Sequence, residues 1–148
     1  MTSVETMVRE GKIHPFQATR GEIVRVMTIA KRDLAEAERI QCETLDWSFA
    51  IAYNAVLQTC RAYMFNMGYR AASSEAHKTA FEFMRVTVDE PLRQTIGYFD
   101  RTRIKRHRVI YDEPGLVTEK ETQQLISKAK VFLEYVEREL EKKGGKLP

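Results

Sequence analysis

The sequence lacks the features that define several common classes of protein. It has 2 cysteines in 148 residues and no C-x-x-C pair, which argues against a disulfide framework and a zinc site. Cys42 and Cys60 fall inside helical patterns, and we expect both to be buried thiols. The longest apolar stretch, residues 49–56, is interrupted by Tyr53 and Asn54 and is far shorter than the roughly 18 residues of a membrane-spanning helix.

Sequence motifs of metal and nucleotide chemistry are also missing. The chain contains no H-E-x-x-H, no repeated E-x-x-H, no glycine-rich phosphate loop and no G-x-S-x-G. We therefore expect neither a metal site nor a cofactor. The first twelve residues include Glu5 and Glu10 and no apolar core, so they do not resemble a signal peptide. A cytoplasmic protein without a membrane partner is expected.

The composition is that of a folded globular protein. Hydrophobic residues make up 43% and charged residues 30%, and the mean hydropathy is -0.43. A chain of 148 residues buries roughly two-thirds of its unfolded surface around one core. The net charge of +3 is too small to predict a nucleic-acid partner by itself. We predict an N-terminal arm over 1–18, a helical bundle over 19–143 and a tail over 144–148.

Hydrophobic periodicity predicts an all-α fold, an antiparallel bundle of four or five helices. Thr19 and Glu22 form a capping-box pattern before a helix over 20–43, and Thr118 and Glu121 form another before the last helix. Asp46 is the predicted cap of a second helix that runs to about residue 67. That helix is apolar almost all round, which favours a central position.

The remaining helices are predicted from caps and breaks. Ser73 and Ser74 precede a third helix, Pro91 suits the first turn of a fourth, and residues 113–115 end it. No strand is predicted. His77, in the first turn of the third helix, is interpreted as a structural histidine. Tyr53 is interpreted as a core residue that carries a hydrogen bond.

One segment, residues 100–112, breaks the amphipathic pattern. Five basic side chains lie close together in it: Arg101, Arg103, Lys105, Arg106 and Arg108. The apolar stripe of the fourth helix, continued at about 100° per residue, reaches Arg103, Arg106 and His107, where core residues are expected. Charged groups rarely occupy such positions unless they are paired or face a functional cleft.

Two interpretations of this segment remain open. Arg103, His107 and Tyr111 are spaced four apart and line one side of a helix, where a guanidinium, an imidazole and a phenol make a surface suited to phosphate. Alternatively, the arginines form a buried salt-bridge network with Asp112, Glu113 or acids of the first helix.

Three stretches of the chain resemble the HEPN family of small helical domains. They are the run Ala50-Ile-Ala-Tyr-Asn-Ala-Val-Leu57, the segment Gly68-Tyr-Arg70 with His77 downstream, and Arg103-Ile-Lys-Arg-His-Arg-Val-Ile-Tyr-Asp112 before the last helix. The resemblance covers roughly residues 20–142. It implies a dimer whose two motif helices face each other. It also implies a metal-independent ribonuclease in which an arginine holds the scissile phosphate and a histidine helps to activate the 2′-hydroxyl.

The family motif fits the basic segment in two registers. With Arg106 and His107 as the motif's arginine and polar residue, Tyr111 stands in place of the family histidine, and a tyrosine is a poor base at neutral pH. With Arg101 as the motif arginine, His107 follows after five intervening residues, which fits the spacing. The first register leaves catalysis open.

The resemblance implies an RNA-directed protein, with a toxin-type endoribonuclease as the first hypothesis. The catalytic candidates are Arg106, His107 and Tyr111, and the phosphate-binding candidates are Arg101, Arg103, Lys105 and Arg108. The alternative is a non-catalytic module that binds a nucleotide, an RNA, an antitoxin or a partner nucleotidyltransferase through the same patch. A purely structural adaptor is the third hypothesis.

Overall fold

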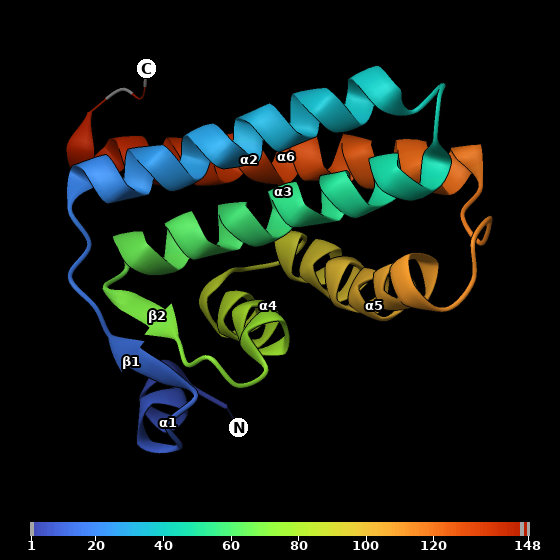
Figure 1. Ribbon diagram of the computed structural model, residues 1–148. Coiled ribbons are helices and arrows are strands. Elements are labelled where there is room, and N and C mark those ends of the chain that lie inside the picture. Colours follow the sequence, from blue (N-terminus) through green and yellow to red (C-terminus); the bar gives the residue numbers. More distant parts are fainter. Residues whose placement is uncertain (1, 146, 148) are drawn as a thin grey trace.

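The computed structural model describes residues 2–145 and residue 147. In this part of the chain six helices pack around one hydrophobic core, and a pair of short strands joins the N-terminal segment to them (Figure 1). The all-α prediction is confirmed.

The central element is α3 (Leu45–Asn66). It runs beside α2 (Arg20–Ile40) and α6 (Glu119–Gly144), and α4 (Ala76–Thr87) and α5 (Leu92–Tyr111) pack against it as well (Figure 1). Because α3 has neighbours on several sides, it buries residues nearly all round, as its sequence predicts.

Local signals set the ends of two helices as predicted. Both capping boxes form, Thr19 with Glu22 at the start of α2 and Thr118 with Glu121 at the start of α6. The predicted cap of α3 was wrong. Thr44 caps that helix, whereas the carboxylate of Asp46, in the first turn, accepts a hydrogen bond from the backbone N–H of Gly115 at 2.9 Å.

The start of α4 also differs from the prediction. The residue before this helix is Glu75, in the left-handed conformation with φ of 53°, and its side chain makes no capping hydrogen bond. Ser73 and Ser74, the predicted caps, lie outside the helix because the chain turns at Glu75 before it begins.

The N-terminal segment contains structure that periodicity does not show. A short helix, α1 (Val4–Arg9), leads to β1 (Ile13–Pro15), which pairs antiparallel with β2 (Tyr69–Ala71). The prediction of no strand was therefore wrong, since three residues are too few to show an alternating pattern. Met7 and Ile13 are fully buried and anchor this segment to the core.

Two further predictions concern cysteine burial and membrane insertion. Cys60 is buried, but Cys42 is exposed, because α2 ends at Ile40 and leaves Cys42 in the following turn. Within the described residues, no helix combines the length and the hydropathy needed to cross a membrane.

Candidate functional site

The second half of α5 turns one arginine toward the protein interior. Phe99, Thr102 and Val109 are buried, and Arg106 lies between the last two on the same face, since positions 99, 102, 106 and 109 recur at three- and four-residue spacing. The prediction that His107 also takes a core position was wrong. His107 is exposed, because the buried stripe passes through Thr102 and Val109 and so lies to one side of it.

Arg106 is half-buried without an opposite charge. Its guanidinium carbon lies 5.6 Å from the centre of the Tyr53 ring on α3, a cation–π geometry. Its Nε is buried and has no hydrogen-bond partner among the described residues. Among the described residues, no carboxylate oxygen lies within 4.0 Å of the nitrogen atoms of the Arg106 guanidinium. Such an arrangement leaves a positive charge without an opposite charge beside it, which an anion at the edge of the protein can supply.

Arg106 faces a hollow between α4 and α5 of about 630 Å³. The α5 side is lined by Arg103, Ile104, Arg106, His107, Arg108 and Tyr111, and the α4 side by residues 75–78. Arg106 also lines a second hollow, of about 560 Å³, which Trp47, Asn54 and Tyr111 share. The first hollow is lined by four cationic side chains and the single acid Glu75. Asp100 and Glu113 offset two of these positive charges, and a positive excess remains.

His77 reaches this hollow from the first turn of α4. Its Nδ1 lies 3.3 Å from the Tyr53 hydroxyl, and the two rings are 5.9 Å apart. Partial burial lowers the pKa of His77, and the positive charges of Arg106 and Arg103 lower it further. His77 is therefore held neutral near pH 7. Burial raises the pKa of Tyr53, so its phenol stays protonated and keeps the hydrogen bond.

Two arginines of the segment have carboxylate partners, but they do not form the predicted buried network. Arg103 Nε donates to Asp100 Oδ1 at 3.0 Å, and Arg85 of α4 pairs with the other oxygen of the same carboxylate at 3.0 Å. Arg108 approaches the predicted partner Glu113 to 4.0 Å. Asp100 thus positions Arg103 at the edge of the hollow, whereas Arg106 takes no part in these ion pairs.

The structure divides the seven predicted site residues between two faces of α5. Arg103, Arg106, His107, Arg108 and Tyr111 line the same hollow, and the rings of His107 and Tyr111 lie 4.9 Å apart. Arg101 and Lys105 line a different and smaller hollow of about 180 Å³, where Lys105 pairs with Glu121 of α6. The spacing that joins Arg101 to His107 in sequence does not bring them into one hollow.

Sequence reasoning missed what Tyr53 and His77 do together. Each was placed correctly, Tyr53 in the core and His77 in the first turn of its helix. That both face Arg106 depends on how α3, α4 and α5 pack. No local pattern carries this information, because the residues lie 24 and 29 positions apart along the chain.

Comparison with known proteins gives a family match. Residues 23–139 match the HEPN domain, a stretch that runs from the first turns of α2 into the last turns of α6 and includes the whole basic segment. No curated protein and no solved structure matches the chain significantly.

Proposed function

Because the chain belongs to the HEPN domain family, we propose that it is an RNA-directed protein that binds an RNA phosphate in the hollow between α4 and α5. The family is commonly associated with ribonuclease toxins. The observation that carries the proposal is Arg106, a half-buried arginine with a buried donor and, among the described residues, no carboxylate partner. A phosphate supplies the opposite charge that this side chain lacks.

The same hollow has the groups for RNA cleavage without a metal. Arg106 and Arg103 hold the scissile phosphate. His77, kept neutral with its ring proton on Nδ1 toward the Tyr53 oxygen, takes the proton of the 2′-hydroxyl on Nε2 as the 2′-oxygen bonds to phosphorus. The bond from phosphorus to the 5′-oxygen then breaks, and His107 protonates that oxygen. The products are a 2′,3′-cyclic phosphate and a 5′-hydroxyl. Tyr111, packed on the His107 ring, orients it.

A second candidate function is RNA or nucleotide binding without cleavage. It is favoured by the register in which Tyr111 replaces the family histidine, and by the separation of Arg101 from His107 on α5. HEPN domains often pair with nucleotidyltransferases. A nucleotidyltransferase or an antitoxin is then the partner that we propose for this surface.

The experiment that separates these functions is incubation of the purified protein with total RNA in EDTA, with Arg106→Ala as the comparison. Cleavage by the wild type and not by the variant supports the ribonuclease. Binding that depends on Arg106 without cleavage supports the second candidate. If neither protein binds or cleaves RNA, the proposed function is wrong.

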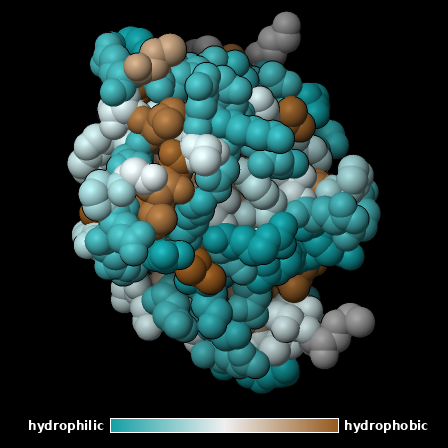
Figure 2. All heavy atoms as spheres, turned by 90° about the vertical axis from the view of Figure 1, so that its right-hand side faces the viewer, coloured by the Kyte–Doolittle hydropathy of each residue, from teal (hydrophilic) through white to brown (hydrophobic). Residues whose placement is uncertain are grey.

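We propose in addition that two copies associate through the outer side of α5. Ile104, Tyr111 and Trp47 are 58%, 66% and 57% exposed, unusually high for large apolar side chains. Tyr111 lines a hollow with each of the other two. Figure 2 views the end of the molecule where α5 ends, and a few small hydrophobic patches interrupt a mostly hydrophilic surface there. A symmetric homodimer buries these side chains of both copies in one shared interface.

A further inference from the structure

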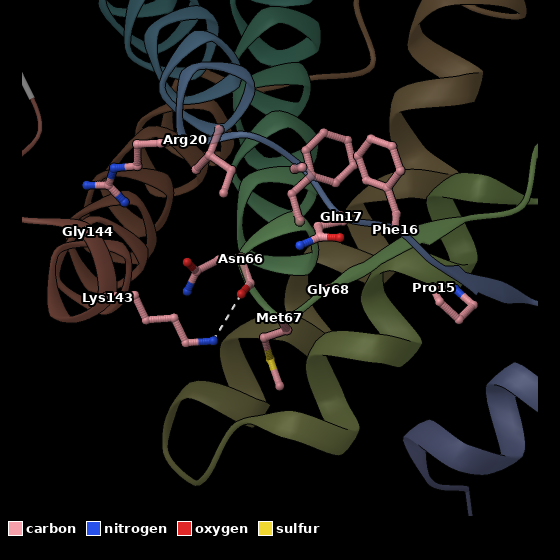
Figure 3. Close-up of a pocket in the computed structure, with 12 residues that line it drawn as sticks. Pro15, Phe16, Gln17, Arg20, Asn66, Met67, Gly68, Lys143 and Gly144 are labelled. Carbon is pink, nitrogen blue, oxygen red and sulfur yellow. Dashed lines mark hydrogen bonds between the residues drawn. The ribbon is translucent and has the colours of Figure 1, made fainter.

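A hollow of about 720 Å³ lies at the far end of the bundle from the loop between α5 and α6 (Figures 1 and 3). Its two cations have partners. Arg20 donates to the carbonyl oxygens of Leu140 at 3.1 Å and Gly145 at 2.7 Å, and Lys143 donates to that of Asn66 at 3.1 Å. These contacts satisfy carbonyl groups at helix C-termini, so the cations are structural.

A neighbouring groove has a different character. It has a volume of about 580 Å³ and is lined by Arg25 of α2, Arg61 of α3 and Arg70 of β2. All three arginines are exposed, and none has a carboxylate oxygen within 4.0 Å among the described residues. The acid that lines the groove, Glu22, is already engaged in the capping box of α2. Three elements thus bring three uncompensated positive charges to one groove.

Aromatic rings alternate with these arginines. Phe16 and Phe65 lie 4.9 Å apart at an interplanar angle of 54°, and Phe16 also borders the larger hollow (Figure 3). The Arg61 guanidinium carbon is 5.4 Å from the Phe65 ring centre, and that of Arg70 is 5.7 Å from the Phe16 ring centre. Single-stranded nucleic acids are bound by this combination, since guanidinium groups hold phosphates and ring faces stack on bases.

The groove continues the candidate site. Ala76 and His77 line both the groove and the hollow that contains Arg106. Ala76 and His77 therefore lie at the border between the two hollows. Three separate cations along one groove suit the successive phosphates of a nucleic acid strand better than they suit a single compact anion.

We infer that this groove binds the single-stranded RNA that flanks the phosphate held at Arg106. Arg25, Arg61 and Arg70 hold backbone phosphates, and Phe16 offers its ring to a base. The inference rests on the proposed function and adds to it a direction for the RNA, from α5 past His77 toward β2.

The test uses fluorescence anisotropy with a labelled 2′-O-methyl RNA strand of about 12 nucleotides, within the size range of single-strand sites and without a 2′-hydroxyl to react. Arg61→Gln/Arg70→Gln removes two phosphate contacts. The matched control, Arg9→Gln/Arg138→Gln, removes two exposed arginines that line none of these hollows. Binding is measured over a range of salt concentrations, and melting temperatures confirm that each variant is folded.

The groove variant should bind about tenfold more weakly than wild type at low salt, and the slope of log affinity against log salt should fall by about 1.4, since each contact to a single strand contributes about 0.7. The control should bind close to wild type. Phe16→Leu should weaken binding equally at every salt concentration, because stacking is not electrostatic.

Two outcomes would overturn the inference, and they differ from failure of the proposed function. Wild-type binding by the groove variant, with weak binding by Arg106→Ala, leaves the proposed function standing and removes the groove. The same holds if adenosine monophosphate binding depends on Arg61 and Arg70 while binding of the strand does not, since the groove then takes a free nucleotide. If the wild-type protein does not bind RNA at all, both the proposed function and the inference about the groove are wrong.

Discussion

Arg106 keeps its charge half inside the protein, where the described residues offer it an aromatic face and no acid. A charge in such a place is a cost to the fold unless a ligand or ion compensates it. Truncation of a salt-bridged arginine instead lowers the stability of the fold, because the partner carboxylate is left buried without an opposite charge. The stability of Arg106→Ala therefore shows whether Arg106 is an unpaired arginine at a ligand site or a salt-bridged structural arginine.

We predict that Arg106→Ala leaves the free energy of unfolding within about 1 kcal/mol of wild type or slightly raises it. The measurement is urea unfolding followed by circular dichroism. Loss of about 3–5 kcal/mol is the expected cost of breaking a buried ion pair, and such a loss would show that Arg106 is a structural residue.

His77 gives a prediction about pH. Its pKa in the folded protein lies below the usual 6.5, so as the pH falls through 6.5 the unfolded chain takes up a proton that the folded protein does not. Stability from this group is present above pH 6.5 and is lost as the pH falls toward the folded pKa. His77→Gln should therefore lose less stability than wild type between pH 7.5 and 5, measured by urea midpoints.

The contribution of Arg106 to this shift can be measured separately. Arg106→Gln removes a positive charge that lowers the pKa of His77, so the titration midpoint of the His77 ring, followed by NMR, should move upward. An unchanged midpoint would show that the two side chains do not sense each other as the structure indicates.

At the scale of elements, capping residues determine where a helix begins. Thr118 accepts a hydrogen bond from the backbone N–H of Glu121 at 3.1 Å, and the Glu121 side chain accepts one from the Thr118 N–H at 3.1 Å. Thr118→Ala removes the hydrogen bond from the Glu121 N–H to the Thr118 hydroxyl and leaves the other one. We predict a loss of about 1 kcal/mol, or a melting temperature lower by about 2–4 °C.

A matched threonine within a helix serves as the control for this substitution. The Thr28 hydroxyl donates to the Val24 carbonyl oxygen on the exposed face of α2 and caps nothing. Thr28→Ala should be neutral or stabilise by up to about 0.7 kcal/mol, because alanine has the higher helix propensity. Equal losses in the two variants would contradict the capping account.

The sequence predicts an element well where the signal lies in neighbouring residues, as in a capping box, or where an apolar pattern extends over a long helix. Both capping boxes and the central position of α3 were predicted correctly. The pair of β1 and β2 was missed, since three residues show no period. On α5 the predicted core stripe ran through Arg103, whereas Thr102 is buried, because packing against neighbouring helices decides which side of a helix faces inward.

At the scale of the whole molecule, the predicted homodimer can be tested through one exposed side chain. Ile104 is 58% exposed on α5, within the surface that we propose as the interface. Light scattering should show a dimer at roughly tens of micromolar for wild type. Ile104→Asp should show a monomer, because it places a carboxylate, and by symmetry its copy, in an apolar contact.

Val131→Asp is the control for the homodimer test. Val131 is 64% exposed but lies on α6, outside the proposed interface. It should remain a dimer. A monomeric wild type, or a monomer in both variants, would contradict the proposed interface.

The candidate site was only half predictable from the sequence. The α5 residues could be found because they are concentrated in one short segment. Their division into two faces follows from helical geometry, but the meeting of Arg106 with His77 and Tyr53 depends on three helices packing together. From the sequence alone, Tyr53 and His77 are each interpreted as structural residues, because no local pattern links them to Arg106.

The central claim is that RNA phosphate is held in the hollow that contains Arg106, and not in the smaller hollow that contains Arg101. The most direct test compares the affinities of Arg106→Ala and Arg101→Ala for single-stranded RNA over a range of salt concentrations. Both changes remove one positive charge from α5, but Arg101 lines a different hollow. We predict that Arg106→Ala lowers the affinity at least tenfold and the salt slope by about 0.7, while Arg101→Ala stays close to wild type. Equal effects, or a larger effect of Arg101→Ala, would contradict the assignment of the site.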